Sequence, residues 1–155
     1  MDTSIVSYRK TSDAYTTYEL RTPDAQGDEG EIYCTELGTL DGITYVSVPA
    51  GITLPEQLPQ VAATLQPVTP TPELIAQLKA ISPHCALISE RMVQKIRARY
   101  SIDDEMFFAR IGVGAANGMY QMTPKERDEM QAFGDFVESV RQWGRAERAK
   151  LGLSI

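Results

Sequence analysis

The chain has 155 residues, enough for one ordinary domain or two very small ones, since the share of surface that folding buries rises with chain length. Hydrophobic residues at 43% and charged residues at 23% lie in the globular range, which argues against wholesale disorder. The net charge of −6 is uneven: residues 1–70 hold ten acidic and three basic side chains, and residues 71–155 hold eleven and twelve. Because phosphate backbones attract proteins with a large basic excess, we expect no nucleic-acid partner.

Residues 1–48 are predicted to form a small β-rich interaction part. β-Branched and aromatic residues recur in four runs that turn residues separate. These runs cover residues 4–8, 15–20, 31–37 and 43–48. The last two flank a glycine-containing turn and predict a β-hairpin. Since neither face of this hairpin is cleanly apolar, the sheet needs a further surface to cover it, and its last strand either pairs within the chain or adds to a neighbouring sheet.

Residues 49–70 are predicted to form a proline-rich connector. Six of the nine prolines lie within residues 49–72, where Glu56 is the one charged residue. Because proline fixes φ and removes a hydrogen-bond donor, this density predicts an extended segment and excludes a helix or a central strand. Apolar residues such as Leu54 and Leu58 favour a segment that lies along a partner's surface over a plain linker.

Residues 71–155 are predicted to form a helical domain. Three times a serine or threonine stands directly before a proline, a pairing that begins helices with a hydroxyl cap. The pairs are Thr71-Pro72, Ser82-Pro83 and Thr123-Pro124, and Ser101 before a run of acids gives a fourth start. The predicted helices cover about 72–81, 83–99, 102–111 and 124–150. The predicted fold class is therefore α+β, with a β-rich part, an extended connector and a C-terminal helical hairpin or bundle.

Two of the predicted helices carry apolar stripes. In the second helix, Cys85, Ile88, Met92 and Ile96 recur at spacings of three and four. The fourth helix has a broader face, and both faces are expected to pack on each other or on other copies. The interface candidates are apolar residues of the last strand, the connector and the fourth helix: Ile43, Tyr45, Val46, Leu54, Leu58, Met130, Phe133, Phe136, Val137, Val140 and Trp143.

Residues that could carry chemistry have simpler explanations. His84 is the only histidine, which excludes histidine triads and multi-histidine metal sites within one chain. The acids at 103–105 suit the positive first turn of a helix better than a cation site. The glycines at 112–118 lack the Lys-Ser/Thr ending of a P-loop and predict a flexible connection. We therefore expect no catalytic residues, no cofactor and no metal, and a protein that is not an enzyme.

The cysteines and the first residues bear on location. Cys34 and Cys85 form no CxxC or Cys/His cluster, which favours free thiols in a reducing compartment. The first ten residues lack the succession of a signal peptide, and no apolar run approaches the roughly 20 residues of a spanning helix. We expect no membrane partner, and a protein kept in the cytoplasm or in a particle assembled there.

The helices carry a resemblance to a known group of proteins. Residues 82–105, with 136–138 and 141–147, resemble small proteins encoded in tail-gene clusters of tailed bacteriophages, chiefly those of Mu-like phages. The likeness covers about half of the chain and contains no catalytic signature. It implies a virion component of the tail tip, baseplate or tail fibre, or a chaperone that helps such a part assemble.

The leading hypothesis is a structural virion protein that bridges or attaches tail-tip or fibre subunits. It is expected to bind other tail proteins and to form a homo-oligomer or a multi-copy assembly. The alternatives are a tail-fibre assembly chaperone and a small host-directed adaptor or inhibitor. Because the sheet, connector and helices each leave apolar surface to cover, we also expect the isolated protein to be poorly ordered or to self-associate.

Overall fold

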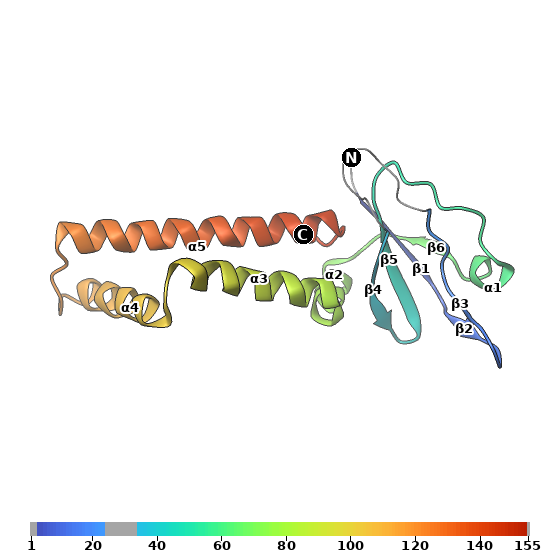
Figure 1. Ribbon diagram of the computed structural model, residues 1–155, viewed down its shortest axis with the longest axis horizontal. Coiled ribbons are helices and arrows are strands. Elements are labelled where there is room, and N and C mark those ends of the chain that lie inside the picture. The colour runs from blue at the N-terminus through green and yellow to red at the C-terminus, as the bar shows by residue number, and fades with distance from the viewer. Residues whose placement is uncertain (1–2, 24–33, 155) are drawn as a thin grey trace. The chain divides into compact units, whose positions relative to one another are not determined.

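A computed structural model describes residues 3–23 and 34–154 of the chain (Figure 1). The class is α+β, as predicted, with a small antiparallel sheet followed by helices. The chain divides into a sheet unit, residues 1–87 and 147–155, and a helical unit, residues 88–146. This division differs from the predicted one at 49–70, since it falls inside two long helices.

The main sheet has the strand order β4-β5-β1-β6, and all of its pairings are antiparallel. The strands are β1 (Ser4–Tyr8), β4 (Thr35–Leu40), β5 (Ile43–Val48) and β6 (Gln66–Val68), and a separate pair is formed by β2 (Thr11–Ser12) and β3 (Thr17–Tyr18). The predicted hairpin is confirmed as β4–β5, with Leu40 opposite Ile43. Asp41 and Gly42 turn it with φ of 50° and 78°. The predicted run at 31–37 lies partly outside the described residues.

The last predicted strand does not lie at a sheet edge. β5 pairs with β4 on one side and with β1 on the other, so its backbone hydrogen bonds are used within the chain. In this sheet the edges are β4 and β6. The hypothesis that residues 43–48 add to a neighbouring sheet is therefore wrong, because a central strand has no free edge to offer.

The segment 49–70 is not a connector between two bodies. It contains a short helix, α1 (Pro59–Ala62), and then β6, which pairs with β1 at Ile5–Val68 and Ser7–Gln66 (Figure 1). Pro67 is tolerated because β6 is an edge strand, where a residue without an N–H breaks no second ladder. The segment thus completes the sheet unit.

Both faces of the main sheet are covered by the chain itself. On one face Ile5 packs in a cluster with Leu37, Ile75, Leu78, Cys85 and Leu153. On the other face Tyr8 and Val46 pack with Val61 of α1. These side chains are at most 5% exposed. The sequence predicted a sheet that needs a further surface to cover it, and in the structure the chain itself supplies that cover on both faces.

The C-terminal residues belong to this core. The last helix ends at Lys150, and Gly152 follows with a φ of 75°. Leu153 N donates to Arg148 O and Gly152 N donates to Ala149 O, the two hydrogen bonds of a Schellman motif. This turn carries Leu153, which is 0% exposed, into the cluster around Ile5.

The long helices begin where their caps predict. They are α2 (Pro72–Ile81), α3 (Pro83–Arg99), α4 (Ile102–Ala116) and α5 (Pro124–Lys150). Ser101 and Asp104 form a reciprocal capping box, with hydrogen bonds of 3.0 and 2.8 Å. The predicted flexible connection at 112–118 is wrong for most of its length, because α4 continues to Ala116. Gly112 there lies beside the Met130 sulfur.

In the helical unit, α5 packs antiparallel to α4 and to residues 88–99 of α3. Gly112 of α4 meets Met130 near the start of α5, and Met92 of α3 meets Gly144 near its end. Between them, the Tyr100 ring lies 5.0 Å from the Phe133 ring and 5.7 Å from the Phe136 ring. The predicted apolar stripe of the fourth helix therefore forms the seam of this unit.

Candidate functional site

The interface candidates of the sheet unit lie in or near its own core. Val46 is 4% exposed and packs with Tyr8 and Val61. Tyr45 and Ile43 are half-buried, and Tyr45 packs against the cluster around Ile5. Leu54 and Leu58 are also half-buried. These residues contribute to the fold of the sheet unit, and they do not form one exposed apolar surface.

The interface candidates of α5 lie along the seam of the helical unit. Val140 is buried, and the other five are half-buried: Met130, Phe133, Phe136, Val137 and Trp143. Phe133 stacks on Phe108 at 5.2 Å between ring centroids. The Lys95 ammonium group lies 4.6 Å from the centre of the Trp143 ring. This face of α5 is thus occupied by α3 and α4.

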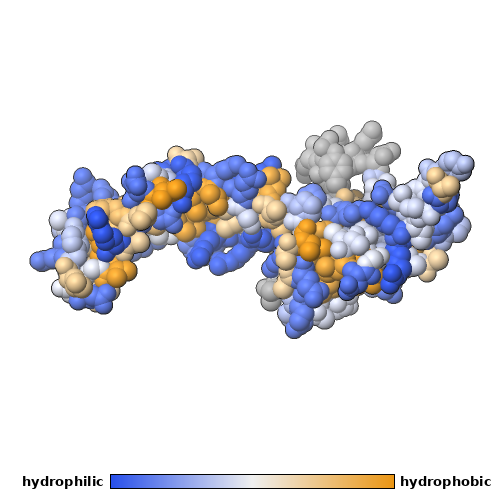
Figure 2. All heavy atoms as spheres, turned by 90° about the horizontal axis from the view of Figure 1, so that it is seen from below, coloured by the Kyte–Doolittle hydropathy of each residue, from blue (hydrophilic) through white to orange (hydrophobic). Residues whose placement is uncertain are grey.

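Three of the exposed large apolar residues of the helical unit lie on α4. Ile102, Met106 and Val113 are 58%, 65% and 63% exposed, and Ala109 between them is exposed as well. Their spacings of four, three and four residues place them on one side of the helix. We call these four residues the outer α4 face. Figure 2 shows hydrophobic residues among hydrophilic ones on the surface of the helices at its left.

The outer α4 face lies opposite the side of α4 that packs within the chain. Ile111 is 2% exposed, Phe108 and Ala115 are half-buried, and these residues point about half a turn away from Met106. A surface helix normally has one apolar stripe and a polar back. α4 has two apolar sides, of which packing within the chain uses one.

Two opposite charges border one edge of the outer α4 face. Asp103 and Arg110 are both exposed and lie seven residues apart, which places them on the same side of the helix. The Arg110 guanidinium lies 5.8 Å from the Phe107 ring. On the other edge Glu105 forms an ion pair of 2.7 Å with Arg97. Glu105 is thus paired within the chain, whereas Asp103 and Arg110 are exposed on the opposite edge.

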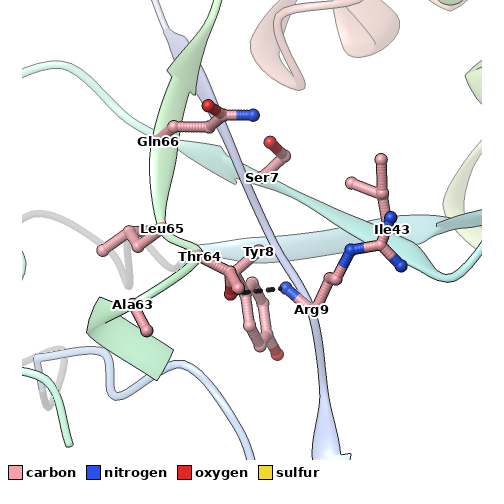
Figure 3. Close-up of a pocket in the computed structure, with 8 residues that line it drawn as sticks. All are labelled: Ser7, Tyr8, Arg9, Ile43, Ala63, Thr64, Leu65 and Gln66. Carbon is pink, nitrogen blue, oxygen red and sulfur yellow. Dashed lines mark hydrogen bonds between the residues drawn. The ribbon is translucent and has the colours of Figure 1, made fainter. Parts of the chain in front are cut away.

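A pocket of about 320 Å³ lies in the sheet unit, where the ends of β1 and β6 meet (Figure 3). Arg9 N donates to Thr64 Oγ1 at 2.9 Å across it. Figure 3 shows Gln66 and Ser7 along one wall and the Arg9 side chain beside Ile43. The titratable residues of the lining are Tyr8 and Arg9, and the lining contains no histidine, carboxylate or thiol.

The basic residues at 95–99 are largely engaged within the helical unit. Lys95 lies over Trp143, the Arg99 guanidinium lies 4.7 Å from the Phe136 ring, and Arg97 pairs with Glu105. Beside Trp143 the surface is hollowed by about 440 Å³ between Arg91, Gln94, Lys95 and Ala98. This hollow is open, and of its two basic side chains Lys95 lies over the Trp143 ring.

The other residues considered for chemistry keep structural roles. His84 is exposed in the first turn of α3. The Ser101 backbone N–H donates to the Asp104 carboxylate at 2.8 Å, and the Ser101 hydroxyl accepts from the Asp104 backbone N–H at 3.0 Å. Hydrogen bonds with the backbone and then the side chain of Ser101 lower the pKa of the Asp104 carboxyl. Both cysteines are free, and burial raises the pKa of the Cys34 thiol. Within residues 3–23 and 34–154 no three His, Cys, Asp or Glu side chains gather as a metal site.

No helix in the described part of the chain is long and apolar enough to cross a membrane. Comparisons with protein-family models, with curated proteins and with solved structures found no match for this chain. The candidate site is therefore defined by its geometry alone.

Sequence reasoning named interface candidates on the last strand, the connector and the fourth helix, and it did not single out the outer α4 face. The signal was present, since Ile102, Met106, Ala109 and Val113 follow helical spacing. Ending the predicted helix at residue 111 removed Val113 from the pattern. The glycines at 112 and 114 caused that early end.

Proposed function

We propose that this chain is a non-enzymatic interaction protein of a phage tail, which bridges or attaches tail-tip or fibre subunits. The observation that carries the proposal is the outer α4 face, where three large apolar side chains are each more than half exposed. Isolated exposed apolar residues are common on proteins, but a stripe on one side of a helix marks a surface that another protein covers. The role is therefore that of a binding module.

The sheet unit supports a binding role in a different way. Both faces of its main sheet are covered, and its C-terminal residues close the core, so this unit is a folded body in its own right. The sheet unit thus has its own core, and the helical unit carries the exposed apolar stripe. This combination suits a part that attaches to a larger assembly.

The assignment to a phage tail comes from the resemblance of residues 82–105, 136–138 and 141–147 to small tail-cluster proteins. That stretch includes Ile102 and the two charged residues that flank the start of the outer α4 face, Asp103 and Glu105. The resemblance thus covers the first turn of α4 and one of the four residues of the outer α4 face, Ile102. A tail-fibre assembly chaperone is the alternative, and it would bind its client only until assembly is complete.

The proposal is tested on phage particles produced from a genome that carries this chain. Mass spectrometry of purified particles is expected to detect the protein in a fixed ratio to tail subunits. Met106→Glu in the phage gene places a charge on the outer α4 face and is expected to remove the protein from particles. Met119→Glu is the matched control, because Met119 is 85% exposed but does not belong to that face.

Two outcomes would contradict the proposal. If wild-type particles lack the protein while phage production still depends on it, the chaperone reading is correct. If Met106→Glu and Met119→Glu both enter particles at the wild-type ratio, the outer α4 face is not the attachment surface.

A further inference from the structure

We infer that the outer α4 face binds the same face of a second copy of this chain, in an antiparallel, two-fold symmetric pair. The inference rests on the proposed function only in taking this face as a protein interface. It adds the identity of the partner. The reasons are the order of large and small residues along the face and the position of the two charges at its edge.

The apolar residues are spaced symmetrically about the middle of the face. In a two-fold symmetric, antiparallel helix pair, each residue faces a residue of the other copy, and the numbers of any two facing residues add to the same sum. With the axis between residues 107 and 108, Ile102 lies opposite Val113 of the second copy, and Met106 lies opposite Ala109. Each long methionine then faces a small alanine, which lets the two helices approach closely.

The charges at the edge follow the same symmetry. In an antiparallel two-fold pair, a given edge of one helix meets the identical edge of the other. Asp103 therefore lies within two residues, about 3 Å of helix rise, of the position opposite Arg110 in the second copy. The long arginine side chain spans this offset. The symmetry makes the contact twice, so the pair gains two ion pairs between opposite charges.

The other edge raises no conflict. There Glu105 lies near Gly112 of the second copy, which has no side chain to oppose it. The charge of Glu105 is already balanced by Arg97 within its own chain. On both edges the nearest like charges of the two copies, Glu105 with Glu105 and Arg110 with Arg110, lie five residues or about 7.5 Å of helix rise apart, farther than the roughly 3 Å between Asp103 and Arg110.

The contact area sets the expected strength. Ile102 to Val113 spans eleven residues, or about 16 Å of helix, so the pair buries less than the roughly 1,200 Å² of a standard stable interface. We therefore expect reversible dimers with a dissociation constant on the order of micromolar, which salt weakens. Many copies in one assembly multiply such a weak contact.

The test uses charge reversal in the purified full-length chain, with sedimentation velocity over a range of concentrations. Asp103→Arg and Arg110→Asp each bring like charges together across the pair, and each is expected to weaken dimerisation at least tenfold. The double variant Asp103→Arg/Arg110→Asp is expected to restore it. A mixture of the two single variants is expected to form heterodimers more readily than each variant forms homodimers.

Two apolar variants complete the test. Met106→Glu is expected to abolish dimers, and Met119→Glu is expected to leave them at the wild-type level. Circular dichroism confirms that each variant keeps its helices. A wild-type chain that stays monomeric up to several hundred micromolar overturns the inference, as do dimers that both single charge reversals leave unchanged.

The two proposals fail separately. A monomeric chain whose Met106→Glu variant is still lost from particles refutes the second copy as the partner and leaves the proposed function standing. A chain that dimerises as described but is absent from particles refutes the structural role in the tail and leaves the dimer standing.

Discussion

Gly144 of α5 lies directly against the sulfur of Met92 on α3. A Cβ atom at Gly144 would overlap that sulfur, so the absence of a side chain lets the two helices come together. Glycine in a helix interior costs about 0.5–1 kcal/mol relative to alanine, and this close approach offsets the cost. The contact fixes how α5 packs on α3 in the helical unit.

Gly144→Ala is therefore expected to lower the free energy of unfolding by about 1–2 kcal/mol, since Met92 must move away from the added methyl group. Gly134→Ala is the matched control on the same helix. A Cβ at Gly134 meets no atom within 4 Å, so this change is expected to raise the free energy of unfolding by about 0.5–1 kcal/mol. Urea titration followed by circular dichroism measures both, and equal effects of the two changes would contradict the packing described.

Leu153→Ala tests whether the C-terminal residues are part of the sheet unit's core. Leu153 is 0% exposed within the cluster around Ile5, so the truncation is expected to cost about 2–5 kcal/mol of unfolding free energy. Ser154→Ala, at an exposed neighbour, serves as the control and is expected to stay within about 0.5 kcal/mol of wild type. A Leu153→Ala chain with wild-type stability would show that the C-terminal turn does not close this core.

Phe133→Ala tests the aromatic seam of the helical unit. The Phe133 ring contacts the rings of Tyr100 at 5.0 Å and Phe108 at 5.2 Å, but it is only half-buried. We expect a loss of about 2–3 kcal/mol, below the cost at a fully buried site. Tyr15→Ala, at a residue that is 97% exposed, is expected to change stability by less than about 0.5 kcal/mol. The prediction fails if both changes have the same small effect in thermal unfolding.

Ser101→Ala tests the capping box of α4. Loss of the hydroxyl that accepts from Asp104 N is expected to cost about 1 kcal/mol. It is also expected to raise the pKa of the Asp104 carboxyl, which hydrogen bonds from Ser101 lower in the native chain. Because the folded pKa is the lower one, this stabilisation is present above the unfolded pKa of about 3.9 and is lost as pH falls through the folded pKa.

Carboxyl NMR titration of wild type and Ser101→Ala measures the pKa of Asp104 directly, with Asp103 as an internal reference. An unchanged Asp104 pKa in the variant would show that the Ser101 hydroxyl contributes nothing to it. The difference in stability between the two proteins is expected to narrow in strong acid, and the part due to the bond from Asp104 N to the Ser101 hydroxyl is expected to remain.

The sequence predicted the helices well because their ends are set locally. α2, α3 and α5 begin at a proline directly after a serine or threonine, and Gly152 marks the end of the last helix. The end of α4 depends on tertiary contacts. Gly112 and Gly114 pack against Met130 and Tyr120, and this packing holds in a helix the residues whose own preference is for a loop.

The sheet unit was harder to predict because its cover comes from distant parts of the chain. Ile5 is covered by Leu78 of α2 and by Leu153 near the C-terminus, and no local pattern connects these positions. The strand β6 has three residues with Pro67 at its centre, too short and too irregular for a strand signal. The outer α4 face includes Val113, which lies beyond the predicted end of the helix at residue 111. The structure shows that α4 continues to Ala116.

The central claim, that protein covers the outer α4 face in an assembly, has a direct test in methionine oxidation. Met106 and Met119 are 65% and 85% exposed, so an oxidant reaches both in a dilute monomer, and mass spectrometry reads each site separately. With rising chain concentration, and in purified particles, oxidation of Met106 is expected to fall while oxidation of Met119 stays constant. Equal oxidation of the two methionines under all of these conditions would contradict the claim.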